Sequence, residues 1–78
     1  MSEQAIVPPN TAGWMVRIKT PAGMEEFWIA AFPDKVDAEE AIKKRANALP
    51  NEEVEGVAAL SQNELVGRGM QLGDVKRA

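Results

Sequence analysis

The most apolar run of the chain, residues 26–32, lacks the alternation of polar and apolar residues that a strand with one solvated face shows. The run reads Glu-Phe-Trp-Ile-Ala-Ala-Phe and is too short to form an independent helix. A strand whose two faces are both covered has such a continuous apolar pattern. We therefore predict a strand over Phe27–Phe32, and the rest of the chain must supply a cover for each of its faces.

Length and composition limit the possible functions. The chain has 78 residues, which favours one small domain with a thin core. It contains no cysteine and no histidine, so disulfides, thiolate metal sites and the usual pH switch near neutrality are excluded. The net charge of -3 disfavours nucleic-acid binding, which needs a basic surface. No run approaches the roughly 20 apolar residues of a membrane span, and no signal peptide is evident. We expect an acidic, soluble, cytoplasmic protein without membrane partners.

The N-terminal part of the chain divides into two segments. Residues 1–13 contain Pro8 and Pro9, and we expect them to form a flexible N-terminal arm before a single α+β domain over residues 14–78. The segment Trp14–Lys19 alternates between apolar and mostly polar residues, which predicts a half-buried strand. Its expected core face consists of Trp14, Val16 and Ile18.

The segment Thr20–Gly23 has the composition of a turn and predicts a β-hairpin between the two strands. The register of this hairpin decides which residues share a face of the sheet. We prefer a three-residue loop with a bulge at Gly23, because this register pairs Val16 with Trp28 and gives the glycine a suitable position. The face opposite the expected core face then holds Met15, Phe27 and Ile29.

A loop of two or four residues is the alternative to the bulged form. It pairs Val16 with Phe27 and exchanges the two faces of the second strand. The face opposite the expected core then holds Met15, Met24, Trp28 and Phe32.

The next element is a helix. Asp37 has the chemistry of an N-cap and Glu40 completes a capping box, while Pro50 stops the helix. The apolar residues at helical spacing are Ala38, Ala41, Ile42, Ala46 and Leu49.

A third strand is predicted over Val54–Leu60. We prefer to place it beside the first strand, and the alternative is a position beside the second. Ser61 and Glu64 form a second capping box, which begins a short helix that ends at Gly67 or Gly69.

After this helix, Met70 and Leu72 are expected to fold back onto the core, and Val75–Arg77 is a possible short terminal strand. The predicted order is strand, strand, helix, strand and short helix (ββαβα). We expect a two-layer α+β fold, with a three-stranded, mainly antiparallel sheet and one long helix on one face.

The sequence contains few candidates for catalytic or metal-binding residues. Ser61 lacks a base to activate it, and its position explains it as a helix cap. Carboxylates at Glu26, Asp34 and Asp37 offer the only alternative, a small enzyme or an accessory protein that depends on a divalent metal ion. We predict no catalytic residue, cofactor or metal ligand, and an enzyme is the less favoured class.

The apolar residues on the second sheet face are the strongest functional signal. Exposed aromatic residues and methionine often mark contacts between proteins. Because the hairpin has two possible registers, the predicted interface takes residues from both alternatives. They are Met15, Phe27, Trp28, Ile29 and Phe32. Alternatively, the short helix, Met70, Leu72 or the N-terminal arm covers this face within one chain.

The succession of Trp14–Ile18, Phe27–Phe32, Asp37–Ala41 and the tail from Leu60 to Val75 resembles small bacterial single-domain proteins of α+β type. The resemblance covers most of the chain, belongs to no characterised family and implies no activity. Our leading hypothesis is a non-catalytic interaction or regulatory domain. Its open sheet face would bind a protein partner or form a weak homodimer.

Overall fold

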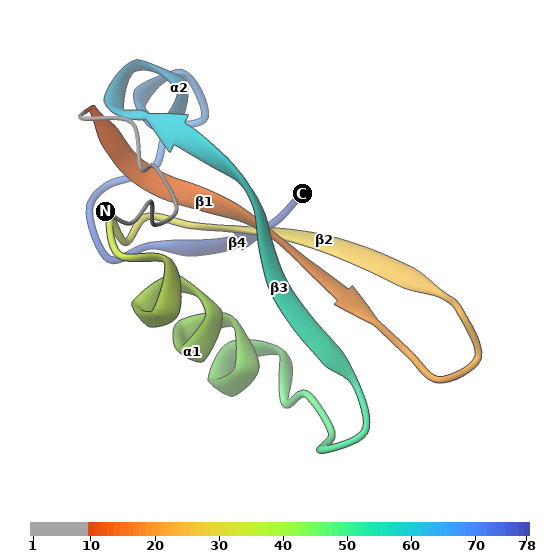
Figure 1. Ribbon diagram of the computed structural model, residues 1–78. Coiled ribbons are helices and arrows are strands. Elements are labelled where there is room, and N and C mark those ends of the chain that lie inside the picture. Colours follow the sequence, from red (N-terminus) through yellow and green to blue (C-terminus); the bar gives the residue numbers. More distant parts are fainter. Residues whose placement is uncertain (1–9) are drawn as a thin grey trace, which may run out of the picture.

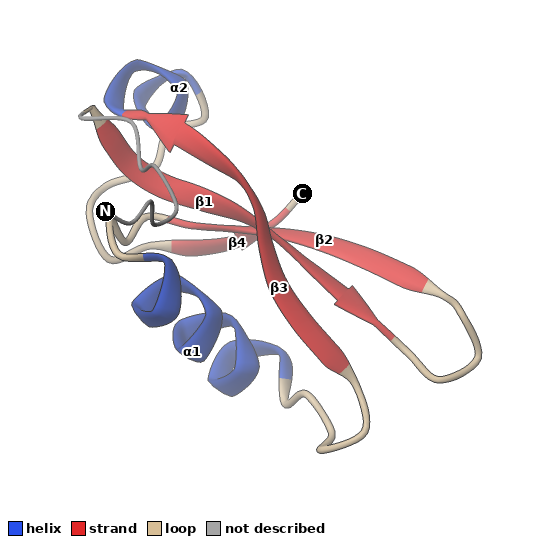
Figure 2. Cartoon of the chain, in the orientation of Figure 1, coloured by secondary structure: helices blue, strands red, loops and turns tan. Residues whose placement is uncertain are grey.

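The hairpin of β1 (Thr11–Lys19) and β2 (Glu25–Ala30) forms the centre of a four-stranded antiparallel sheet in a computed structural model that describes residues 10–78. Figure 1 shows α1 (Lys35–Ala46) along one side of the sheet and α2 (Gln62–Gly67) at one end of it. The strand order is β3-β1-β2-β4, with β3 spanning Glu53–Ser61 and β4 spanning Val75–Arg77. The helices and strands are distinguished by colour in Figure 2. Among residues 10–78, no helix is long and apolar enough to cross a membrane.

The hairpin adopts the preferred register. Val16 pairs with Trp28, and Lys19 pairs with Glu25. Gly23 has a φ of 89°, in the left-handed region that favours glycine, and its N–H donates to the carbonyl of Thr20 over 2.9 Å. The turn chemistry of the sequence therefore selected the correct faces of both strands.

The sheet has one strand more than the three we predicted, and this strand is the possible terminal strand Val75–Arg77. The third strand, β3, pairs antiparallel with β1 as preferred, with an irregularity where Met15 and Val16 face Ala58 and Gly56. The three residues of β4 add a fourth strand beside β2. Two backbone hydrogen bonds, each 2.8 Å long, hold the chain before β4 against Ala31. The N–H of Gly73 donates to the carbonyl of Ala31, and the N–H of Ala31 donates to the carbonyl of Asp74. The α+β class and the antiparallel sheet are thus confirmed, whereas the count of three strands is wrong.

The core between α1 and the sheet follows the predicted alternation. The buried residues of this cluster are Trp14, Val16, Ile18, Ala30, Ala38 and Ile42. The indole N–H of Trp14 donates to the carbonyl of Pro33 over 2.9 Å, which ties the start of the helix region to the first strand. The apolar stripe of the helix thus forms one cover of the central strand.

The limits of α1 differ from the prediction. Asp34, rather than Asp37, is the N-cap, and its Oδ1 accepts a hydrogen bond of 3.1 Å from the backbone N–H of Asp37. The helix ends at Ala46 because Asn47 adopts a left-handed conformation, with φ 54°. The helix therefore ends before Pro50 is reached.

A second core cluster lies on the other face of the sheet, below α2. Its buried residues are Ala12, Ile29, Ala31, Leu60, Leu65 and Met70. The predicted return of Met70 to the core is confirmed, but that of Leu72 is wrong, since Leu72 is 75% exposed. This cluster is the second cover that the apolar run required.

The first strand begins earlier than expected. Its first residue is Thr11, three residues before Trp14, and Ala12 and Gly13 are buried within the sheet. Of the remainder of the predicted arm, Asn10 is an exposed turn residue, and residues 1–9 lie outside the described residues.

The capping box of α2 is present as predicted. The hydroxyl of Ser61 accepts a hydrogen bond of 3.2 Å from the backbone N–H of Glu64, and the Glu64 carboxylate accepts one of 2.7 Å from the backbone N–H of Ser61. Hydrogen bonding of the Glu64 carboxylate to Ser61, chiefly to its backbone N–H and also to its side chain, lowers the pKa of Glu64 below its ordinary value.

The lowered pKa of Glu64 predicts a pH dependence of stability. The charged carboxylate stabilises the fold above the unfolded-state pKa, and this contribution is lost as the pH falls through the lower folded-state pKa. We expect the free energy of unfolding of the wild type to fall relative to that of Glu64→Gln below about pH 4.3. Urea unfolding of both proteins at a series of pH values measures this difference. Parallel curves would contradict the assignment.

Candidate functional site

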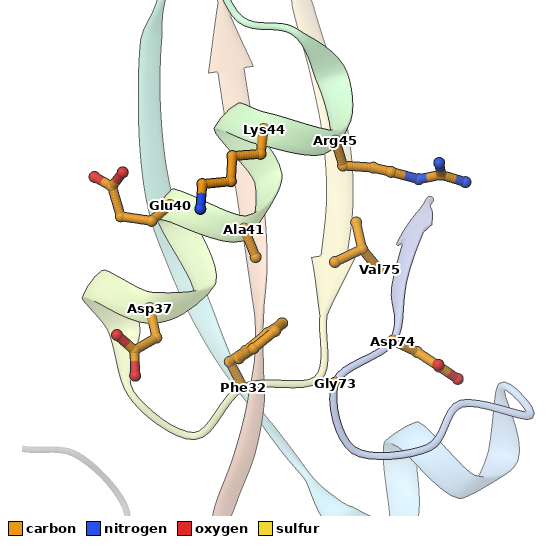
Figure 3. Close-up of a pocket in the computed structure, with 9 residues that line it drawn as sticks. All are labelled: Phe32, Asp37, Glu40, Ala41, Lys44, Arg45, Gly73, Asp74 and Val75. Carbon is orange, nitrogen blue, oxygen red and sulfur yellow. The ribbon is translucent and has the colours of Figure 1, made fainter.

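A wide groove of about 770 Å³ lies between α1 and the segment that leads into β4. Figure 3 shows Phe32 between the two sides of the groove, with the carboxylates of Asp37 and Glu40 on one side and the carboxylate of Asp74 and the guanidinium of Arg45 on the other. The three carboxylates and the guanidinium do not converge on one point. General acid–base catalysis needs groups that converge on one reacting atom, so this groove does not have the arrangement of an active site.

The carboxylates considered for a metal site lie at different ends of β2. Asp34 follows this strand and caps α1, with Asp37 in the first helical turn. Glu26 lies near the hairpin, where its Oε1 accepts a hydrogen bond of 3.0 Å from the indole N–H of Trp28. Within residues 10–78, no group of three or more acidic side chains is positioned to hold a metal ion.

The structure distributes the five predicted interface residues over both faces of the sheet. Trp28 and Phe32 pack at the margin of the core below α1. Met15, Phe27 and Ile29 lie on the opposite face, but Ile29 is only 1% exposed because it belongs to the core below α2. Met15 is half-buried beside that core, and Phe27 is 40% exposed. Of the five predicted interface residues, Phe27 is therefore the exposed one on this face, and Met15 is half-buried between it and the core.

The accessible part of this side of the sheet is a strip that we call the open sheet face. It lies between the core below α2 and the hairpin turn, and strand pairing defines its two rows. In the first row Met15 lies beside Ala58, and in the second row Arg17 lies between Phe27 and Glu55. The residues of the open sheet face are Met15, Arg17, Phe27, Glu55 and Ala58.

Arg17 is the central cation of the open sheet face. Its Nη2 lies 2.8 Å from Glu55 Oε1, and its Nη1 lies 3.8 Å from Glu25 Oε2. Its Nε is buried and has no hydrogen-bond partner among the described residues. The side chain thus lies close to the sheet between two carboxylates. Ion pairs this exposed contribute little to stability, but they fix the direction of the guanidinium.

Sequence reasoning placed Arg17 on the correct face but did not identify it as a site residue. Glu55 and Ala58 were also missed, because their places depend on the irregular pairing of β1 with β3. An irregularity shifts the register by one residue, and no turn motif in the sequence marks this one.

The chain matches no protein-family model, and comparisons with curated proteins and with solved structures find no significant similarity.

Proposed function

We propose that the protein is a non-catalytic interaction domain that binds a partner protein through the open sheet face. The observation that carries the proposal is the side-by-side position of Phe27 and Arg17 on a part of the sheet that no helix among residues 10–78 covers. Aromatic residues, methionine and arginine are enriched in contacts between proteins, and this small surface presents one of each.

Charge and burial support this use of the open sheet face. Phe27 keeps a large part of its ring in water, so a partner that covers it gains the free energy of apolar burial. Arg17 is held in place by Glu55 before any partner arrives, which reduces the conformational entropy lost on binding. The carboxylates beside the strip restrict the partners to surfaces with compatible charge.

Site-specific photo-crosslinking tests the proposal. A photoreactive phenylalanine analogue at position 27 should form a discrete adduct in cells that express the protein, since the ring would be buried against the partner. The mass of the adduct distinguishes a second copy of the chain from a different protein. Phe27→Ala should weaken the association at least about tenfold, as expected for an aromatic side chain at the centre of an interface.

The same analogue at Val36 is the control. Val36 is an exposed apolar residue on α1 and lies outside the open sheet face. Adducts from both positions, or from neither, would contradict the proposal.

A further inference from the structure

The two outer edges of the sheet differ in whether they are available to a further strand. β3 and β4 are the edge strands, and each has backbone N–H and C=O groups that point away from its neighbour. At the edge of β3, the N–H of Gly56 donates to Oε2 of Glu39 on α1 over 2.8 Å. The pairing of β3 with β1 is also irregular next to Gly56. A side chain of α1 and an irregularity thus close the middle of this edge.

The outer edge of β4 is open. The carbonyl of Asp74 accepts a hydrogen bond from Ala31, directly after β2, and the N–H of Ala78 donates to a carbonyl of β2. Because the direction of the backbone groups alternates along a strand, the N–H and C=O groups of Val75 and Arg77 point away from β2. No residue among 10–78 forms a hydrogen bond to these outward groups. This edge is therefore the one that a further strand can extend.

The charges beside Val75 suit a second copy of the same edge. When two β4 strands pair antiparallel with Val75 opposite Val75, Asp74 of each chain lies opposite Lys76 of the other. Lys76 pairs with Ile29 on the face of the core below α2, and Asp74, two residues earlier, shares this face. Opposite charges on facing residues of an antiparallel pair are favourable, so the edge is complementary to itself.

The other possible register is less favourable. With Val75 opposite Arg77, the two copies of Lys76 lie directly opposite each other, and like charges in this position are destabilising. We therefore prefer the register in which Val75 faces its own copy.

Both charges remain available to a second chain. The ammonium group of Lys76 donates one of its three N–H groups to the carbonyl of Arg68, over 3.2 Å. One carboxylate oxygen of Asp74 accepts a hydrogen bond of 2.8 Å from the backbone N–H of Gln71, and the other oxygen has no such bond. Neither side chain forms an ion pair with a residue among 10–78.

On the other face of the sheet, the same contact covers apolar surface. Val75 pairs with Ala30, so its side chain lies on the face of α1, where it is half-buried. It lines the groove beside α1 together with Phe32 and Ala41. Two chains that pair through β4 bring their valines together and join their grooves along one apolar floor.

The charges of α1 have the same order as those of β4. Figure 3 shows Asp37 at the end of the groove where β4 begins and Arg45 at the end where it stops, with Glu40 and Lys44 between them. An antiparallel pair places the acidic first half of each α1 on the side of the basic last turn of the other. This order favours the same orientation as the charges of β4 do.

We propose that two copies of the chain associate through the outer edges of β4, antiparallel and with Val75 opposite Val75. The contact joins two four-stranded sheets into one sheet of eight strands. It uses a different part of the sheet from the open sheet face and does not depend on the function proposed for that face.

Sedimentation equilibrium of the full chain and disulfide trapping test the proposal. We expect the average mass to rise from that of a monomer towards that of a dimer as the concentration approaches about 1 mM. The chain contains no cysteine, so the variants Asp74→Cys and Lys76→Cys each have a single thiol. They are mixed in equal amounts and oxidised.

The disulfide products report the register. Facing residues of a pair without mutual hydrogen bonds have Cα atoms about 4.5 Å apart, which suits a disulfide between positions 74 and 76. Two identical positions lie diagonally, about 7–8 Å apart, which is too far. The mixed disulfide should therefore exceed the two symmetric products together.

Charge reversal tests the complementarity of the two edges. Lys76→Glu and Asp74→Lys each place like charges opposite each other twice, and each should weaken self-association at least about threefold. A mixture of these two variants restores both opposite pairs and should associate as tightly as the wild type. Lys43→Glu is the control, because Lys43 lies on α1 beside the start of β3. It makes the same change of charge as Lys76→Glu and should keep the affinity within about twofold, since exposed ion pairs contribute little.

Four results would overturn the proposal. The first is a wild-type chain that stays monomeric up to about 1 mM. The second is an equal loss of affinity in Lys43→Glu and Lys76→Glu, which would indicate a general effect of charge. The third is a mixture of the two charge variants that associates no more tightly than either variant alone. The fourth is a predominance of the symmetric disulfides, which would exclude the register with Val75 opposite Val75.

Discussion

Ile29→Ala is expected to lower the free energy of unfolding by about 2–5 kcal/mol, the largest effect among the substitutions considered. Ile29 is 1% exposed and is one of the largest fully buried side chains among residues 10–78. It packs with Leu65 and Met70 in the core below α2, so the shorter side chain leaves a cavity between the sheet and that helix. The free energy of unfolding of a domain this small is modest, and a loss of this size removes a large part of it.

Thermal unfolding followed by circular dichroism measures this effect. A domain of 60–100 residues loses about 4–8 °C in Tm for each kcal/mol, so Ile29→Ala should lower the Tm by roughly 10 °C or more. Phe27→Ala is the matched control, because Phe27 lies on the same strand and the same face but is 40% exposed. It should lower the Tm by only a few degrees. If both variants had the same Tm, α2 would not cover this part of the sheet in solution.

The comparison of these two variants also distinguishes a core residue from a residue of the open sheet face, which the sequence alone does not distinguish. Phe27 and Ile29 have the same orientation in the hairpin, so their alternation predicts the same exposure. The difference arises from α2 and Met70, which cover one end of the face and leave the other open. The position of a short helix depends on tertiary contacts that periodicity does not encode.

Local chemistry predicted the hairpin well. The tendency of Gly23 to adopt a positive φ was sufficient to select the register, and the register then determined the faces of β1 and β2. The capping box of Ser61 and Glu64 likewise identified the start of α2, because both of its hydrogen bonds lie within four residues.

Prediction from local sequence was wrong where two nearby residues of the same chemical type were both suited to the same role. Asp34 and Asp37 are both capable of capping a helix, and the structure uses the first, so α1 starts a turn earlier than predicted. Met70 and Leu72 are both apolar and two residues apart, yet only Met70 reaches the core. Its backbone N–H donates to Leu65 O over 3.0 Å, a contact that belongs to the end of α2 and has no equivalent at Leu72.

The candidate sites were less predictable than the fold because they depend on contacts between distant segments. The open sheet face requires the irregular pairing of β3 with β1, which brings Glu55 beside Arg17. The recess lined by Met24 and Leu49 likewise requires the loop after α1 to lie near the hairpin turn. No pattern within either segment indicates its partner.

Gly13→Ala is expected to lower the free energy of unfolding by about 1–3 kcal/mol, as extra volume does in a close-packed core. A Cβ atom at position 13 would lie 2.6 Å from the carbonyl oxygen of Ala30 and 3.0 Å from Cδ1 of Leu65. The Leu65 side chain is able to rotate away, but the carbonyl oxygen belongs to the backbone of β2. Relief of that contact must shift β1 against β2 where Trp14 pairs with Ala30.

The matched control is Gly67→Ala, at the C-terminal end of α2, where an added Cβ meets no atom within 4 Å. Neither Gly13 nor Gly67 has a positive φ, so both substitutions restrict the unfolded chain alike and add no backbone strain in the folded state. Alanine also favours the helix at position 67, so the control should keep or raise the midpoint of urea unfolding. The difference between the two midpoints then measures the steric contact at Gly13. Equal midpoints would show that β1 does not pack this closely against Ala30.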